Sequence, residues 1–234
     1  MTIRGNFAAA VVLCITALIG SCSSEIGGRE AVERLQDMGT LSYLIATPSA
    51  GECEVLASQD DETLVPLASV FKLYVLGAVV DAVRVGQVSW DDPIQIREEF
   101  DSLGGTTSEE EPGTELPVRQ LAIRMISESD NTATDHLMNL VGREAVEQIQ
   151  PSMGHSQPSV NVPIPTTREV TILKWSGDTD LAERRTILDD DVATRPLPTA
   201  AQRESPVFRY QDSVGWFGTP GDACRALSWL AEDG

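Results

Sequence analysis

Lysine is almost absent from this chain of 234 residues, in which Lys72 and Lys174 are the only two. The 17 basic side chains are outnumbered by 36 acidic ones, which gives a formal net charge of −19 at pH 7. Such an acidic surface repels phosphate backbones and anionic lipid headgroups. We therefore exclude nucleic acid as a partner of this protein.

Histidine is equally scarce, with His136 and His155 as the only two. Hydrolytic zinc sites are built from clustered histidine, cysteine and carboxylate ligands. Two histidines are too few to indicate such a cluster, and we expect no metal and no other cofactor. Both histidines are interpreted as structural or exposed residues.

Long hydrophobic runs are also missing after the N-terminus. The apolar run from Phe7 to Ile19 follows a positively charged start, and it is shorter than the ~20 residues of a spanning helix. Ile19-Gly20-Ser21-Cys22 resembles a lipobox. We expect residues 1–21 to be a lipoprotein signal peptide, with the protein exported and lipid-anchored through Cys22 to the outer face of the cell membrane. A plain secretory signal with an incidental Cys22 is the alternative.

Cysteine is limited to four residues, of which Cys14 lies in the predicted signal. Besides Cys22, this leaves Cys53 and Cys224 for the folded domain. An oxidising exterior permits a disulfide between them. Whether their Cα atoms come within reach of each other is left open by the sequence.

The segment after the signal predicts a short helix and a hairpin. Residues 22–40 are expected to form a linker and a helix near Arg29 to Met38. Two strands are expected from Leu41 to Thr47 and from Cys53 to Ser58, joined by a turn at Pro48 to Gly51.

Helical periodicity dominates the rest of the chain. Four or five helices are expected between Ser69 and Ile149, and a last one from Thr219 to Leu230. Residues 176–206 are polar, contain proline and lack periodicity, which is typical of a long loop. No internal repeat is evident, and the length after the signal allows one domain or two interleaved lobes.

A serine and a lysine three residues apart form the first chemical motif, Ser69-Val70-Phe71-Lys72. A serine hydroxyl needs a base within hydrogen-bond reach, and a lysine one helical turn away on the same face can supply it. Burial would lower the pKa of such a lysine enough for it to act as a base.

The residues after this motif place Ser69 at the start of a largely buried helix. Apolar side chains recur at helical spacing, and Gly86 follows them as an expected C-cap; they are Leu73, Leu76, Val79, Val80 and Val83. The helix dipole would favour negative charge near the backbone N–H of Ser69, which makes half of an oxyanion site. The alternative reading makes Ser69 an ordinary helix start and Lys72 a solvated surface charge, although the rarity of lysine weakens it.

A second motif, Ser129-Asp130-Asn131, lies between two predicted helices. The first runs from Leu116 to Ile126, opened by Pro117, and the second from Thr132 to Val141. Asp and Asn are common helix N-caps, so a purely structural reading of this turn is the alternative.

Together the two motifs resemble the first two motifs of the class A β-lactamases and penicillin-binding proteins, the serine enzymes that recognise penicillin. Three flanking stretches are similar as well: Pro66 to Leu73, Gly86 to Pro93 and Met125 to Leu137. The similarity runs from about residue 40 onwards. Among members of the family, the chain looks like the actinobacterial β-lactamase-like lipoproteins.

The resemblance implies a role for each motif residue. Ser69 would be the acylated nucleophile and Lys72 its base. Ser129 would pass a proton to the leaving nitrogen or oxygen, and Asn131 would hydrogen-bond the substrate amide and Lys72. Asp130 would be structural, with its carboxylate accepting backbone N–H groups.

The resemblance also implies an α+β, β-lactamase/transpeptidase-like fold over residues 41–234, with a helical lobe and an antiparallel sheet. The family's third motif, Lys-Thr/Ser-Gly, follows the second by roughly a hundred residues, and the printed sequence contains no such triplet. We therefore expect a C-terminally truncated domain with an incomplete sheet. Losing one oxyanion donor of this strand would cost on the order of a hundred- to a thousand-fold in rate.

Class A enzymes also carry a deacylating glutamate on a loop after the second motif. Glu169 is the nearest candidate here, but its flanking residues differ from the family pattern, and we interpret it as an ordinary helical surface residue.

Two functions follow from these expectations. The first is a serine hydrolase that forms an acyl-enzyme on Ser69 and acts on β-lactams, peptidoglycan-like peptides or esters, as a β-lactamase or as a D,D-peptidase or esterase. The second is a catalytically inactive or truncated lipoprotein of the same fold that acts as a binding or structural protein.

Overall fold

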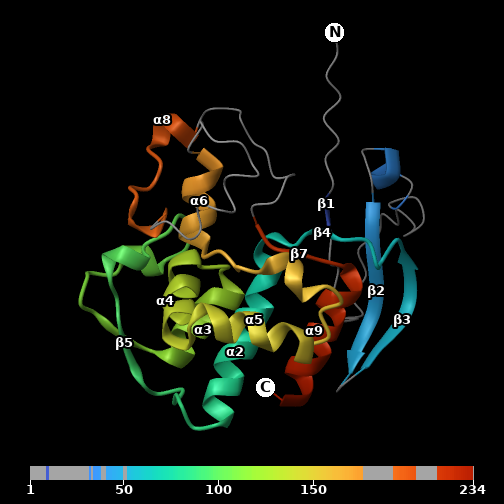
Figure 1. Ribbon diagram of the computed structural model, residues 1–234, viewed down its shortest axis with the longest axis horizontal. Helices are drawn as coiled ribbons and strands as arrows, with labels where there is room; N and C mark the ends of the chain where they lie inside the picture. The colour runs from blue at the N-terminus through green and yellow to red at the C-terminus, as the bar shows by residue number, and fades with distance from the viewer. Residues whose placement is uncertain are drawn as a thin grey trace, which may run out of the picture.

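The computed structural model describes residues 9–10, 32, 34–37, 41–49, 52–175, 192–203 and 215–233. A helical lobe built around α2 (Lys72–Arg84) packs beside a small sheet. Helix α9 (Pro220–Asp233) stands between the two, in contact with α2 on one side and with strands β2 and β3 on the other (Figure 1). Among the described residues, no helix has the length and apolar character needed to cross a membrane.

The predicted hairpin is present. Strands β2 (Leu41–Ser49) and β3 (Glu52–Gln59) pair antiparallel, with a shift in register between Ile45 and Ala46. The structure also pairs the two-residue strand β1 (Ala9–Ala10) in parallel with the start of β2. These two residues belong to the predicted signal peptide, and they occupy an edge of β2 whose N–H and C=O groups can accept another strand.

Two short antiparallel pairs complete the described sheets. Strand β4 (Val65–Pro66) pairs with β7 (Phe217–Gly218), and β5 (Pro93–Gln95) pairs with β6 (Glu115–Pro117). The second pair corrects one expectation, because the helix predicted from Leu116 begins at Val118. Leu116 is opposite Ile94 in the β5–β6 ladder, which holds it in an extended conformation.

Four α-helices lie in the stretch where four or five were expected. After the 3-10 turn η1 (Ala68–Phe71), the chain forms α2 (Lys72–Arg84), α3 (Val118–Ser127), α4 (Asn131–Val141) and α5 (Arg143–Ser152). Two short 3-10 turns lie between α2 and α3, η2 (Glu98–Phe100) and η3 (Thr107–Glu109). A further one, η4 (Pro158–Asn161), follows α5.

The stretch predicted as a long loop is partly helical where it is described. Helix α6 (Thr167–Trp175) precedes it, and η6 (Val192–Thr194) and α8 (Ala200–Arg203) lie within it. Val192 is buried against Ile172 and Leu173 of α6, which ties η6 to that helix. Residues 176–191 and 204–206 of the predicted loop lie outside the described residues.

Helix α2 forms the centre of the core and is buried on more than one side. The expected apolar stripe is only partly correct, because Leu73, Leu76 and Val83 are half-buried while Tyr74 and Val75 are fully buried. A helix that contacts α3, α4, α5 and α9 has no single buried stripe.

A disulfide between Cys53 and Cys224 joins β3 to α9, with the two Cα atoms 6.1 Å apart. The sequence left this pairing open. The bond closes a segment of 171 residues and attaches the hairpin to the helix that supports it.

Candidate active site

Ser69 lies in the 3-10 turn η1, and Lys72 is the first residue of α2. The hydroxyl-bearing residue is exposed, whereas the lysine side chain is 2% exposed. The alternative reading of Lys72 as a solvated surface charge is therefore wrong. Ala68, directly before the nucleophile candidate, has a φ of 48°, a left-handed conformation that is unfavourable for alanine.

Three hydrogen bonds surround the ammonium group of Lys72. Its Nζ lies 2.5 Å from the carbonyl oxygen of Ser129, 3.1 Å from Ser129 Oγ and 2.8 Å from Asn131 Oδ1. The Oγ of Ser129 lies 2.8 Å from Ser69 Oγ. The structure thus joins four of the five polar residues predicted from the two motifs in one hydrogen-bond network, with Ser129 as the link between Ser69 and Lys72.

Burial controls the basicity of this lysine. Loss of hydration lowers the pKa of Lys72 to about 8, and the nearby carboxylates of Asp130 and Asp135 act in the opposite direction. A neutral fraction of the amine is therefore present near physiological pH. The buried carboxylates also stabilise the ammonium form that results when the amine accepts a proton.

Asp130 is fully buried, and both of its carboxylate oxygens accept backbone hydrogen bonds. Oδ1 accepts from Ala133 N at 2.8 Å and so caps α4, and Oδ2 accepts from Thr107 N at 2.7 Å. Gly105 packs against this carboxylate so closely that a Cβ there would lie 2.2 Å from Asp130 Cγ. The carboxylate therefore links the second motif to the loop before η3.

Asn131 joins the lysine to the same loop. Its Oδ1 accepts from Lys72, its Nδ2 donates to the carbonyl of Leu103, and its backbone N–H donates to the carbonyl of Gly104 at 3.1 Å. The second motif and the loop of residues 103–105 are thus fixed to each other through main-chain and side-chain bonds.

Glu169 corrects another expectation. It is helical, in the first turn of α6, but it is 4% exposed and not a surface residue. Its Oε1 accepts from Arg143 Nη2 at 2.7 Å, and its Oε2 accepts from Thr166 N at 2.7 Å. The ion pair with a cation 26 residues away allows burial, and Glu169 serves as an anchor between α6 and α5.

Asp135 is a buried acid that was not singled out in the sequence. It is 3% exposed, and it accepts three hydrogen bonds at 2.8 Å each, from Thr167 N, Thr167 Oγ1 and Arg168 N at the start of α6. Burial raises the pKa of Asp135 to about 7. Its position four residues after Asn131, on the same side of α4, is the signal that could have indicated a role near Lys72.

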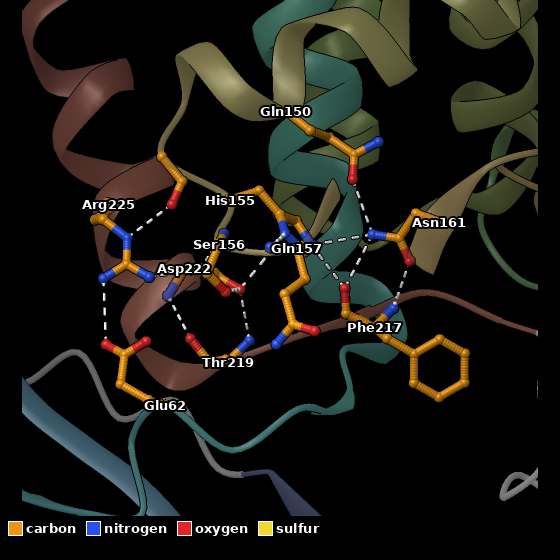
Figure 2. A network of polar contacts seen from close by, with 11 residues as sticks. Glu62, Gln150, His155, Ser156, Gln157, Asn161, Phe217, Thr219, Asp222 and Arg225 are labelled. Carbon is orange, nitrogen blue, oxygen red and sulfur yellow. Dashed lines mark hydrogen bonds and ion pairs between the residues drawn. The ribbon is translucent and has the colours of Figure 1, made fainter. Parts of the chain in front are cut away.

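The two histidines are buried and hydrogen-bonded to the backbone. His136 Nε2 accepts from Arg97 N at 3.0 Å while Nδ1 lies 2.7 Å from the carbonyl of Thr132, and burial lowers the pKa of His136. His155 belongs to a separate network around β7 (Figure 2). Within the described part of the chain, no three His, Cys, Asp or Glu side chains are grouped as a metal site would require. Cys22, the predicted lipidation site, lies outside the described residues.

A sequence model of the Beta-lactamase enzyme family matches residues 30–215. No curated protein matches the chain. Among solved structures, the β-lactamase from Sphaerobacter thermophilus DSM 20745 is 31% identical over 54% of this chain and 47% of its own, with a TM-score of 0.47.

Penicillin-binding proteins are similar in fold as well. Penicillin-binding protein 5 from Haemophilus influenzae is 15% identical over 82% of this chain and 45% of its own, with a TM-score of 0.51. Penicillin-binding protein D2 from Listeria monocytogenes, in its cefotaxime-bound form, is 17% identical over 76% and 56%, with a TM-score of 0.47. The chain thus spans about half the length of these solved proteins.

The expected α+β, β-lactamase/transpeptidase-like fold is confirmed by the helical lobe with its small antiparallel sheets, by the family model and by the likeness in fold to penicillin-binding protein 5. The family model extends over most of the sequence and ends at the residue before Trp216. This protein therefore belongs to the Beta-lactamase enzyme family.

Proposed function

We propose that this protein is a serine hydrolase that forms an acyl-enzyme on Ser69 and acts on β-lactams or related amides and esters. The observation that carries the proposal is the chain of hydrogen bonds from Ser69 Oγ to Ser129 Oγ at 2.8 Å and on to Lys72 Nζ at 3.1 Å. A nucleophile linked in this way to a buried amine of lowered pKa is the arrangement that serine activation requires.

Acylation would begin with neutral Lys72. The amine accepts a proton through the hydroxyl of Ser129, which takes the proton of Ser69 as it gives up its own. The Ser69 oxygen then forms a bond to the substrate carbonyl carbon. The backbone N–H of Ser69 lies at the start of η1, which runs directly into α2, and it can donate to the negative oxygen of the tetrahedral intermediate.

Collapse of that intermediate would reverse the proton path. The bond between the carbonyl carbon and the leaving nitrogen or oxygen breaks, and the leaving atom takes a proton from Ser129. Ser129 is reprotonated by the ammonium of Lys72, which returns to its neutral form. The products of this half-reaction are an ester on Ser69 and a protonated leaving group, so the residues return to their starting charge.

Hydrolysis of the acyl-enzyme is proposed to be the slow step. Both oxygens of Glu169 are engaged, by Arg143 and by the backbone of Thr166, and those of Asp135 accept three hydrogen bonds from α6. Glu169 and Asp135 therefore use their carboxylate oxygens to bind α6 and its neighbours, and neither acts as the base that activates water. This observation favours the slower turnover of a penicillin-binding protein or D,D-peptidase as the second candidate function.

The proposed setting is the outer face of the cell membrane. The lipobox-like sequence before Cys22 supports export and a lipid anchor on that cysteine, and substrates of this class occur outside the membrane. Metabolic labelling with a clickable fatty acid tests this part separately. Incorporation into the protein that is lost in Cys22→Ala is the expected result, and equal incorporation in both would contradict it.

Covalent labelling by a fluorescent penicillin tests the chemistry. We expect time-dependent labelling of the purified protein, and no labelling of Ser69→Ala. Ser127→Ala is the matched control, because Ser127 is an exposed serine nearby whose hydroxyl donates only to its own helix, at Ile123 O. Labelling that persists in Ser69→Ala would contradict the proposal. A folded protein that reacts with neither penicillin nor an activated ester would instead favour the non-catalytic binding protein.

A further inference from the structure

Trp216 contacts the nucleophile turn on both sides of Ser69. Its carbonyl oxygen accepts a hydrogen bond from Leu67 N at 2.8 Å, two residues before the serine. Its ring stacks on the ring of Phe71, two residues after the serine, with centroids 3.7 Å apart and planes 3° apart. Both aromatic side chains are buried. One residue therefore supports the turn from both ends.

The nucleophile turn needs such support because its backbone is strained. Ala68 keeps a φ of 48°, and a non-glycine residue remains in this conformation only when its surroundings determine it. The ladder that leads into the turn is two residues long, with Val65 opposite Gly218 and Pro66 opposite Phe217. The position of Ser69 thus depends on what holds residues 216–218.

A buried asparagine holds this segment by its backbone. Asn161 Oδ1 accepts from Phe217 N at 2.8 Å, and Asn161 Nδ2 donates to the carbonyl of Phe217 at 2.9 Å (Figure 2). The amide side chain, which is 1% exposed, makes the same pair of bonds as a residue on an adjacent antiparallel strand. The side chain of Asn161 therefore extends the β4–β7 ladder by one pairing.

Neighbouring groups fix the orientation of that asparagine and of the tryptophan ring. Gln150 Oε1 accepts from Asn161 Nδ2 at 2.8 Å, and His155 Nε2 lies 2.8 Å from the same Phe217 carbonyl, as Figure 2 shows. Trp216 Nε1 donates to the carbonyl of Pro165 at 2.9 Å. The segment that supports the nucleophile is thus attached to residues about 50 to 65 positions earlier in the chain.

Helix α9 begins directly after this segment and is anchored in the same network. Thr219 and Asp222 cap each other, with Thr219 N donating to Asp222 Oδ2 and Asp222 N donating to Thr219 Oγ1, both at 2.9 Å. Ser156 N and Arg225 Nη2 donate to Asp222 as well. These bonds hold the start of α9, whereas Asn161 holds β7 itself, so the two functions can be separated by substitution.

We infer that Asn161 and Trp216 are positioning residues for Ser69. Asn161 fixes the backbone of Phe217, and the neighbouring Trp216 contacts Leu67 and Phe71 on either side of the serine. These contacts keep Ser69 Oγ at 2.8 Å from Ser129 Oγ. The kinetic consequence of this inference rests on the proposed acylation of Ser69. Its structural consequence, a nucleophile turn held in place by these two residues, is independent of the proposed acylation.

The test compares substitutions in the full chain. In Asn161→Ala we expect the first-order rate of acylation by a fluorescent penicillin at saturation to fall about 10- to 100-fold, since a shift of about 1 Å can cost that much. The concentration giving half the maximal rate and the pH midpoint are expected to stay unchanged, because Lys72 keeps its hydrogen bonds to Ser129 and Asn131. Ser156→Ala is the control. It removes a hydroxyl that donates to Asp222 and makes no hydrogen bond to Phe217.

A second pair of variants separates positioning from folding. Trp216→Phe keeps an aromatic ring against Phe71 but loses the hydrogen bond to Pro165, and it should lose less of the rate than Trp216→Leu. Trp216→Leu removes both the bond and the stacking and should lose about tenfold or more. Hydrogen–deuterium exchange of the peptide covering residues 65–71 is the readout that needs no activity. We expect faster exchange there in Asn161→Ala and Trp216→Leu, and unchanged exchange in Ser156→Ala.

The outcomes distinguish this inference from the proposed function. A wild-type protein that never acylates defeats the proposed function, and the exchange measurement still decides whether the two residues fix the turn. Wild-type rates and wild-type exchange in Asn161→Ala and Trp216→Leu would overturn the inference. If Asn161→Ala fails to fold, the Trp216 pair decides: equal rates and exchange in Trp216→Phe and Trp216→Leu would overturn it.

Discussion

Lys72 holds Ser129 at two points, with its Nζ 2.5 Å from the carbonyl oxygen and 3.1 Å from the hydroxyl oxygen of that residue. The unusual φ of 57° at Ser129 belongs to this arrangement, in which one residue presents both groups to the same amine. Because the hydroxyl also lies 2.8 Å from Ser69 Oγ, the lysine fixes the residue that links it to Ser69.

Removing the Ser129 hydroxyl should uncouple the nucleophile from its base. We expect Ser129→Ala to lower the acylation rate by about 100-fold or more, the usual worth of a positioned proton-transfer group. Ser129 is exposed, so the thermal midpoint should change little. Stopped-flow labelling with a fluorescent penicillin measures the rate, with Ser127→Ala as the control. A rate within twofold of the wild type would show that Ser129 does not carry the proton.

The acylation rate should rise with pH and level off above a midpoint near 8. The reason is that burial lowers the pKa of Lys72 to about 8, and only the neutral amine present above that value can accept a proton. A pH–rate profile between pH 6 and 10 on the protein, checked for retained fold at each pH, measures this. A flat profile across that range would contradict Lys72 as the base.

Asp135 should make the protein less stable as the pH rises from about 4 to about 7. Its folded-state pKa is raised to about 7 from an ordinary value of 3.8, so in this range the unfolded chain releases a proton that the folded chain keeps. The stabilisation is complete below pH 4 and is lost towards pH 7, with a size of a few kcal/mol at most.

Asp135→Asn, which cannot titrate, provides the measurement. Urea unfolding at pH 5 and at pH 7.5 should show the free energy of unfolding of the variant improving relative to the wild type as the pH rises. The comparison uses the change with pH, because the amide also replaces an acceptor of Arg168 N by an NH₂ group and lowers stability at both values. If the free energies of unfolding of the variant and the wild type differ by the same amount at both pH values, the pKa of Asp135 is not raised.

Gly105 should tolerate no side chain. A Cβ would lie 2.2 Å from Asp130 Cγ at a φ of 108°, so Gly105→Ala must displace the carboxylate that caps α4. We expect a loss of about 2 kcal/mol or more in the free energy of unfolding, together with reduced acylation. Gly113→Ala is the matched control, because its φ of 95° imposes the same backbone strain but its Cβ meets nothing closer than Gln95 Nε2 at 3.9 Å. Equal losses in both variants would assign the effect to φ alone.

Reduction of the Cys53–Cys224 bond should destabilise the fold strongly. The bond closes a segment of 171 residues, for which the chain-entropy estimate is about 5 kcal/mol. Urea midpoints with and without a reductant measure the effect, and the double variant Cys53→Ser/Cys224→Ser should unfold early in both conditions. A urea midpoint of the wild type that is the same with and without the reductant would contradict a structural role for the bond.

The parts of the fold that were predictable are those set by local patterns. The turn at Pro48 to Gly51 located the β2–β3 hairpin, and α4 ends at Val141 as expected. The two motifs identified the four polar residues that the structure brings into contact. Their proximity could be expected from the resemblance, whereas the bridging position of Ser129 required coordinates.

Long-range contacts explain what the sequence did not indicate. Glu169 was interpreted as a surface residue from its flanking residues, and the partner that allows its burial, Arg143, is 26 positions away. Leu116 left the predicted helix because it pairs with Ile94 across a ladder. The support of Ser69 by Trp216 likewise joins segments some 150 residues apart. Side chains whose role depends on such distant partners give no periodic or motif signal in one sequence.

Peptide-level mass spectrometry after incubation with benzylpenicillin tests the central claim most directly. The account predicts that the proteolytic peptide containing Ser69 gains the mass of one intact penicillin, that fragmentation places it on Ser69, and that Ser69→Ala gains nothing. A folded wild-type protein that remains unmodified under conditions that acylate a penicillin-binding protein, or a modification located on another residue, would contradict it.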